Sequence, residues 1–123
     1  MKVFLVVKSF VPSHLKQKFD DWYEKEHLSE AKNTFYAISA SRGWVMEKED
    51  MHYAYYQFDN LKEANKILKG EALRKMIKIF DKKWSDQVYK TRKIISITQE
   101  VEFWHQFCLL WLGVIYVKKI FRN

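Results

Sequence analysis

The stretch FDDWYEKEHLSE, residues 19–30, decides how the N-terminal third of the chain folds. It belongs to a predicted helix whose apolar stripe comprises Leu15, Phe19, Trp22 and Tyr23. On a straight helix the opposite side carries the next apolar residues, which are Leu28, Ala31 and Phe35. Because one sheet cannot cover both sides, we predict a helix break at residues 27–29. Ser29 is then placed to cap a second short helix that runs to about Phe35.

Strand patterns surround this helical region. Runs of β-branched and aromatic residues predict strands at residues 2–11, 37–47, 51–58 and 92–101. Pro12 ends the first strand, and Ser13 is placed to cap the first helix from His14 onward. A second helical region is expected between Asn60, its N-cap, and Trp84, with an interruption at Gly70. The order β-α-β-β-α-β is the ferredoxin-like arrangement, which is an α+β fold.

The first strand is apolar on both of its faces. Its two alternating sets are Val3, Leu5, Val7 and Phe4, Val6, Phe10. A four-stranded sheet with helices on one side normally leaves its second face wet. Further aromatic bulk on the sheet is expected from Trp44, Tyr53 and Tyr55. We therefore predict that the sheet of a second copy covers this face, so that a homodimer closes a barrel.

Residues 19–30 resemble the signature D-W-Y-x-x-E-H-[IL]-P of EthD-like members of the dimeric α+β barrel superfamily. The matching positions are Asp21, Trp22, Tyr23, Glu26, His27 and Leu28, whereas Ser29 stands where the family usually has proline. The pattern F-D-x-x-W at residues 80–84 and the element order over residues 2–101 extend the resemblance. It implies a homodimer that binds a small apolar or aromatic molecule. Members of the superfamily include cofactor-independent monooxygenases, cyclases and isomerases, and proteins with no known reaction.

His27 is the candidate catalytic residue, because an imidazole transfers protons near neutral pH. The alternative is that His27 caps the C-terminus of the helix. The side chains predicted to hold the substrate are Trp22, Tyr23, Arg42, Trp44, Tyr53 and Tyr55. Arg42 either orients an acidic group of the ligand or extends outward at the rim of the sheet.

No cofactor and no metal is expected. The sequence has no glycine-rich phosphate loop, and the H-x-x-E pair of His27 and Glu30 supplies too few ligands for a metal ion. A non-enzymatic binding or assembly module is the competing class, for which an unreactive His27 suffices.

The strand HYAYYQF, residues 52–58, also approximates the third-strand signature of the RNA-recognition motif, which has the same element order. In that alternative, Tyr53 and Tyr55 stack on the bases of single-stranded RNA. His52 replaces the glycine of the signature, and the first helical region is longer than in that module. The sequence therefore favours the barrel, and nucleic acid is not the expected partner.

The composition describes one domain with a distinct tail. The net charge is +7, and residues 103–123 contribute +3 of it through Lys118, Lys119 and Arg122. Residues 103–117, FWHQFCLLWLGVIYV, are uncharged, and as a helix of about 22 Å they are shorter than the ~30 Å core of a bilayer. We expect a barrel domain at 1–102 and an apolar extension at 103–123, which packs against protein, contacts a membrane or has no fixed structure. A lone cysteine and a short N-terminal apolar run predict a cytoplasmic protein.

Overall fold

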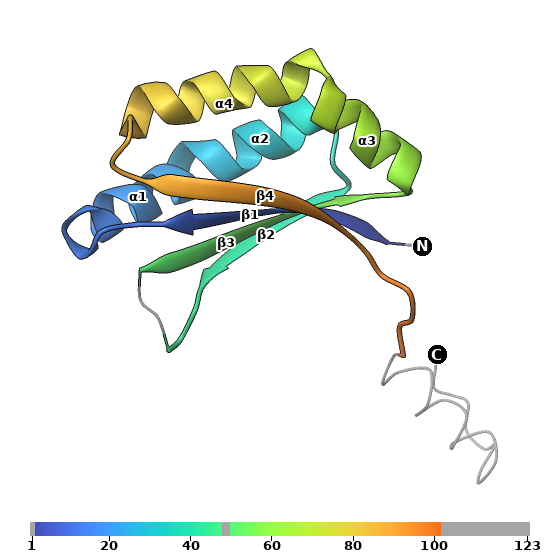
Figure 1. The fold of residues 1–123 in the computed structure, drawn as a ribbon, viewed down its shortest axis with the longest axis horizontal. Coiled ribbons are helices and arrows are strands. Elements are labelled where there is room, and N and C mark those ends of the chain that lie inside the picture. The colour runs from blue at the N-terminus through green and yellow to red at the C-terminus, as the bar shows by residue number, and fades with distance from the viewer. Residues whose placement is uncertain (1, 48–49, 102–123) are drawn as a thin grey trace, which may run out of the picture.

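The structure, a computed structural model, describes residues 2–47 and 50–101. One sheet contains the strands β1 (Val3–Phe10), β2 (Ser39–Trp44), β3 (Met51–Phe58) and β4 (Tyr89–Ser96). One face of this sheet is covered by the helices α1 (Lys16–Trp22), α2 (Leu28–Phe35), α3 (Leu61–Lys69) and α4 (Glu71–Trp84) (Figure 1). A short 3₁₀ helix, η1 (Ser13–Leu15), precedes α1, and a π-helical turn, η2 (Tyr23–His27), joins α1 to α2. The predicted element order and the α+β class are confirmed.

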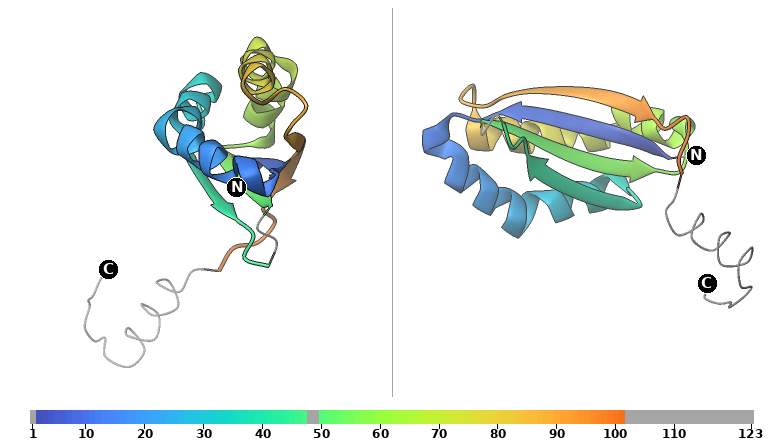
Figure 2. Two further views of the ribbon diagram at one scale, coloured as in Figure 1. Left: turned by 90° about the vertical axis from the view of Figure 1, so that its left-hand side faces the viewer. Right: turned by 90° about the horizontal axis from the view of Figure 1, so that it is seen from below.

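The sheet has the strand order β2-β3-β1-β4, and its neighbouring strands are antiparallel. Strand β1 is central, and Leu5 lies opposite Tyr56 of β3 and Ile94 of β4. The left view in Figure 2 shows the helices on the same side of the sheet. As the central strand, β1 pairs with β3 along one edge and with β4 along the other, and its apolar composition matches this interior position.

The face of the sheet away from the helices, called the open face below, carries a row of apolar side chains. It comprises Phe4, Val6, Phe10, Met51, Tyr53, Tyr55, Tyr89 and Ile95. Trp44 is not among them, because the register pairs it with His52, on the side of the helices. Of the three aromatic residues expected on the sheet, Trp44 therefore lies on the helix side, whereas Tyr53 and Tyr55 lie on the open face. Their rings stack at 6.2 Å with an interplanar angle of 15°.

The predicted helix break at residues 27–29 is wrong, because the helix continues through a π-turn. The buried residues are spaced four apart at Phe19, Tyr23, His27, Ala31 and Phe35. A spacing of four exceeds the 3.6 residues of an α-helical turn, and the wider π-turn absorbs the excess. The N–H of Leu28 accordingly bonds to the carbonyl oxygen of Tyr23, five residues earlier. No side chain caps α2 at its start, so Ser29 is an exposed helical residue.

Local signals at other helix ends had mixed outcomes. Asn60 caps α3 as predicted, since its side-chain oxygen accepts a bond of 2.9 Å from the N–H of Glu63. Gly70 separates α3 from α4, and a Cβ at this position would lie 2.9 Å from the carbonyl oxygen of Lys66. Ser13 does not cap the first helix, because η1 begins there instead and no side chain caps it. Strand β4 begins at Tyr89, three residues before the predicted start at residue 92.

The core lies between the sheet and the helices and is rich in aromatic side chains. Phe19, Tyr23, Tyr56 and Phe80 are each at most 2% exposed. No helix within the described ranges is long and apolar enough to cross a bilayer. The predictions for the extension at residues 103–123 concern residues outside the described ranges.

Candidate functional site

The candidate site begins at His27, whose position depends on the π-turn. Trp22 and His27 are five residues apart, which puts them on different faces of an α-helix but close together on a π-helix. Their rings stack with centroids 4.0 Å apart and planes 15° apart. The ring of Tyr23 meets the same imidazole edge-on at 4.8 Å. The motif residues Trp22, Tyr23 and His27 therefore form one aromatic cluster.

His27 is buried, and one nitrogen of its ring makes no hydrogen bond to the described residues. Its exposed fraction is 4%, and its Nδ1 has no hydrogen-bond partner among the described residues. Burial, followed by the positive charge of Lys90, lowers the pKa of His27 to about 4. The imidazole is therefore neutral at physiological pH and has one unprotonated nitrogen, although burial makes it a weaker base than a solvated imidazole. Because the helix continues beyond His27, the alternative role as a C-terminal cap is wrong.

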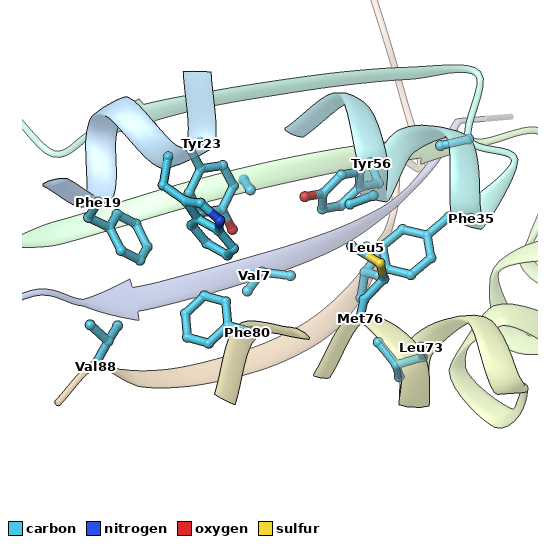
Figure 3. Packing of buried hydrophobic residues seen from close by; sticks show 14 of the residues in the cluster. Leu5, Val7, Phe19, Tyr23, Phe35, Tyr56, Leu73, Met76, Phe80 and Val88 are labelled. Atoms are coloured by element: carbon cyan, nitrogen blue, oxygen red, sulfur yellow. The ribbon is translucent and has the colours of Figure 1, made fainter. Parts of the chain in front are cut away.

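A cavity of about 30 Å³ lies beside His27, between the sheet and α4. Tyr23, Met76 and Phe80 line it together with Val7 of β1 and two cations of β4, Lys90 and Arg92. Figure 3 shows Tyr23, Val7, Phe80 and Met76 around this part of the core. The volume suffices for about one water molecule. A larger ligand therefore has to displace side chains of α4.

Two buried phenols extend the polar part of the site. The hydroxyl groups of Tyr23 and Tyr56 are hydrogen-bonded to each other. Burial raises the pKa of both phenols well above the usual value near 10. Both remain protonated at neutral pH, and Tyr23 therefore offers a neutral hydroxyl next to His27 rather than a charge.

Asp20 organises a second polar cluster at the ends of β2 and β3. Its Oδ1 accepts a bond of 2.8 Å from Nη1 of Arg42 and another of 2.8 Å from Nε1 of Trp44. These two bonds, Trp44 first, lower the pKa of the Asp20 carboxyl group. The Arg42 side chain is only 16% exposed, so it lies inside the protein and not at the rim. The acidic group that it orients in this structure is Asp20.

His52 is the buried polar residue that the sequence analysis did not identify as part of a site. It is 0% exposed, and burial is the main cause that lowers its pKa to about 3. Nη1 of Arg42 lies 3.3 Å from its Nε2, and a guanidinium can only donate. Nε2 is therefore the acceptor, and the proton of the neutral ring lies on Nδ1. The alternation of the strand could have revealed this burial, because His52 shares a face with Ala54 and Tyr56.

The structure divides the predicted ligand-binding residues into two groups. One group lies on the helix side of the sheet and comprises Trp22, Tyr23, Arg42 and Trp44. The ring of Phe19 contacts the rings of Trp22, Tyr23 and Trp44. Tyr53 and Tyr55 lie on the open face. A ligand held between the sheet and the helices cannot contact these two tyrosines from the same subunit.

Carboxylates of the described residues do not build a metal centre around His27. Asp20, Asp21 and Glu24 lie near one another, but the Asp20 carboxylate is already bound by Arg42 and Trp44. Glu30 is exposed, whereas His27 points into the core.

Comparison with known proteins identifies the fold. No protein-family profile and no curated protein matches the sequence. The structure resembles an ethyl tert-butyl ether D (EthD) family protein from Bacillus halodurans, with a TM-score of 0.63 and 16% identity over 80% of this chain and 100% of that chain. It also resembles a mutant of SnoaB, a cofactor-independent oxygenase from Streptomyces nogalater, with a TM-score of 0.58 and 9% identity over 81% and 96% of the two chains. A NIPSNAP family protein from Agrobacterium tumefaciens matches with a TM-score of 0.57 and 7% identity over 84% and 99%.

These similarities confirm the fold that residues 19–30 predict. The chain has the ferredoxin-like α+β fold found in the EthD family protein and in SnoaB.

Proposed function

We propose that this chain, whose fold matches those of an EthD family protein and a cofactor-independent oxygenase, is a homodimer that binds a small aromatic molecule between its sheet and helices. His27 removes a proton from this molecule, and no cofactor takes part. One observation carries the proposal: a buried, neutral imidazole with an unpartnered nitrogen lines a cavity among aromatic side chains.

Proton removal is the step that the geometry supports. An aromatic ligand that loses a C–H proton becomes a carbanion, which can pass an electron to O₂ without a metal or flavin. The methylene group is then oxidised to a carbonyl group. One oxygen atom of O₂ ends in this carbonyl group and the other in a water molecule (CH₂ + O₂ → C=O + H₂O). Cyclases and isomerases begin with the same deprotonation, so they share the role proposed for His27. The oxygenase is favoured because SnoaB has the same fold.

Anthrone tests this role, because its central methylene is acidic and its oxygenation gives anthraquinone. Oxygen uptake and anthraquinone formation are measured with the full chain and with His27→Gln. We expect the variant to be about 10²–10⁴-fold slower, as is typical for loss of a positioned general base. His14→Gln is the matched control, since His14 is exposed on η1. A His27→Gln variant with wild-type turnover contradicts the proposal and leaves a non-enzymatic binding module.

The homodimer is proposed from the open face. Tyr55, Ile95 and Tyr89 are 38%, 40% and 65% exposed there, next to the apolar side chains of β1. A second sheet packed on this row would remove it from water. Tyr53 and Tyr55 would then lie inside the dimer and not bind RNA.

Tyr55→Glu tests the homodimer, because it places a charge at the covered face. We expect a monomer or an aggregate by light scattering, whereas Lys75→Glu, exposed on α4, leaves the dimer intact. A stable dimer of Tyr55→Glu contradicts the proposed interface. Salt-dependent binding of single-stranded RNA that weakens in Tyr53→Ala would favour the RNA-binding alternative instead.

A further inference from the structure

Two cations occupy an unusual place on β4. Lys90 and Arg92 lie on the side of the strand that faces the helices, where the register pairs them with Ser9 and Val7. Such positions of a half-covered sheet normally carry apolar residues. Both cations line the cavity beside His27.

The two cations differ in their partners. Nζ of Lys90 lies 2.7 Å from Oδ1 of Asp81 and 4.2 Å from the centre of the Phe80 ring, so its charge is already engaged. Arg92 has no ion pair and no hydrogen bond from its side chain to any residue within 2–47 and 50–101. No acidic side chain lines the cavity. The cavity is therefore apolar with an uncompensated guanidinium at its β4 edge.

The other arginine on this side of the sheet is not available to a ligand. Arg42 is held by the carboxylate of Asp20 at 2.8 Å and lies against the ring of Tyr23. Of these two guanidinium groups, Arg92 alone is exposed and lacks an anion among the described residues.

We infer that the ligand of this cavity is an aromatic carboxylate, whose anionic group pairs with Arg92 while its ring lies next to His27. The inference rests on the proposed function and adds the charge of the ligand to it. A guanidinium matches a carboxylate with two parallel N–H···O bonds, which gives both orientation and charge recognition. The aromatic rings of Tyr23 and Phe80 offer the matching surface for the ring of the ligand.

Entry of the ring requires space that α4 can provide. The cavity of about 30 Å³ is smaller than any aromatic ring system. Met76 lines it, and an unbranched thioether side chain repacks more readily than a branched one. The ligand is expected to displace this side chain while Arg92 holds its carboxylate.

A competing explanation exists for the same two cations. Strand β4 is at the edge of the sheet, and charges that point inward at an edge protect a sheet against pairing with other chains. That role needs no ligand and predicts no preference between a charged and a neutral aromatic molecule. Binding measurements therefore separate the two explanations.

The experiment compares 2-naphthoate with 2-naphthamide, which has nearly the same shape but no charge. Affinities are measured by isothermal titration calorimetry with the full chain at neutral pH. We expect the carboxylate to bind at least about tenfold more tightly, as a charge-assisted pair is worth more than a neutral hydrogen bond. Arg92→Gln should abolish this preference, so that 2-naphthoate binds no more tightly than 2-naphthamide.

Lys93→Gln is the matched control, because it removes the same charge from the neighbouring residue, which faces the open side opposite Val6. It should keep the full preference for the carboxylate. Both substituted residues are exposed, and thermal melting verifies that the variants fold. Arg92→Lys should retain part of the preference, since it keeps the charge but loses the paired bonds.

Each outcome decides between the proposals. Equal binding of both molecules to the unsubstituted chain, or an equal loss in Lys93→Gln and Arg92→Gln, overturns the inference and leaves the proposed site intact. Binding of neither molecule overturns the proposed function and this inference together. A carboxylate preference that only Arg92→Gln removes supports the inference.

Discussion

Two buried histidines should make the folded protein sensitive to mild acid. His27 and His52 are 4% and 0% exposed, and burial is the main cause that lowers their pKa values to about 4 and about 3. In the unfolded chain both imidazoles return to a pKa near 6.5. Below that pH the unfolded chain binds more protons than the folded one, so stability falls as the pH falls. The stability that the two neutral histidines contribute is fully present above pH 6.5, and it decreases as the pH falls toward their pKa values in the folded protein.

The size of the effect follows from these values. A difference of one pKa unit corresponds to about 1.4 kcal/mol. Between pH 7 and pH 5 the unfolded chain gains most of both protons while the folded rings stay neutral, and each histidine then removes about 2 kcal/mol from the free energy of unfolding. The two together remove about 4 kcal/mol, a large part of the 5–15 kcal/mol typical of a small protein. The pKa of Asp20 is lowered from 3.8, so the stabilisation from this carboxylate is lost only below that pH and does not enter this window.

Urea unfolding at pH 7 and pH 5, at one fixed protein concentration, measures the difference. His27→Gln and His52→Gln should each show about half of the wild-type loss, because each removes one titrating ring. His14→Gln is the control, since an imidazole that is exposed in the folded chain is solvated in both states. The reasoning is refuted if the wild-type protein loses less than about 1 kcal/mol over this interval, or if the double variant loses as much as the wild type.

Two further substitutions test the packing around the site. Asp20→Asn should cost about 2 kcal/mol in the free energy of urea unfolding at pH 7, because it leaves the largely buried Arg42 without its counter-charge; a cost no greater than that of Asp86→Asn, an exposed control, contradicts this role. Met76→Ala should lower stability by about 2–5 kcal/mol and tighten the binding of 2-naphthoate in calorimetry, because it enlarges the cavity. A folded Met76→Ala variant that binds 2-naphthoate more weakly would show that the ligand does not enter this space.

The element order was predictable because its signals are local. A β-branched run forms a strand, and an Asn side chain caps a helix by bonding to the N–H three residues later. Gly70 separates two helices at a position where a Cβ would collide with the carbonyl oxygen of Lys66. These features depend on residues that are close together along the chain.

Residues 19–30 predicted the fold and the candidate residue but not its environment. Two apolar stripes on one helix allow either a break or a change of helical pitch, and local propensity does not distinguish them. The tertiary structure selects the π-turn, because Tyr23, His27 and Ala31 are then buried against the same sheet. The stacking of Trp22 on His27 is a consequence of that choice.

Register decided the remainder of the site. A side chain on a strand points to one of two faces, and only the pairing of Trp44 with His52 places the indole beside Asp20 and not beside Tyr53. The same pairing buries His52 and turns Arg42 toward α1. The sequence alone determined which segments form strands and helices, since that depends on short-range periodicity. Only the tertiary structure decided which polar groups meet, because partners such as Asp20 and Arg42 are 22 residues apart and are brought together by the packing of α1 on the sheet.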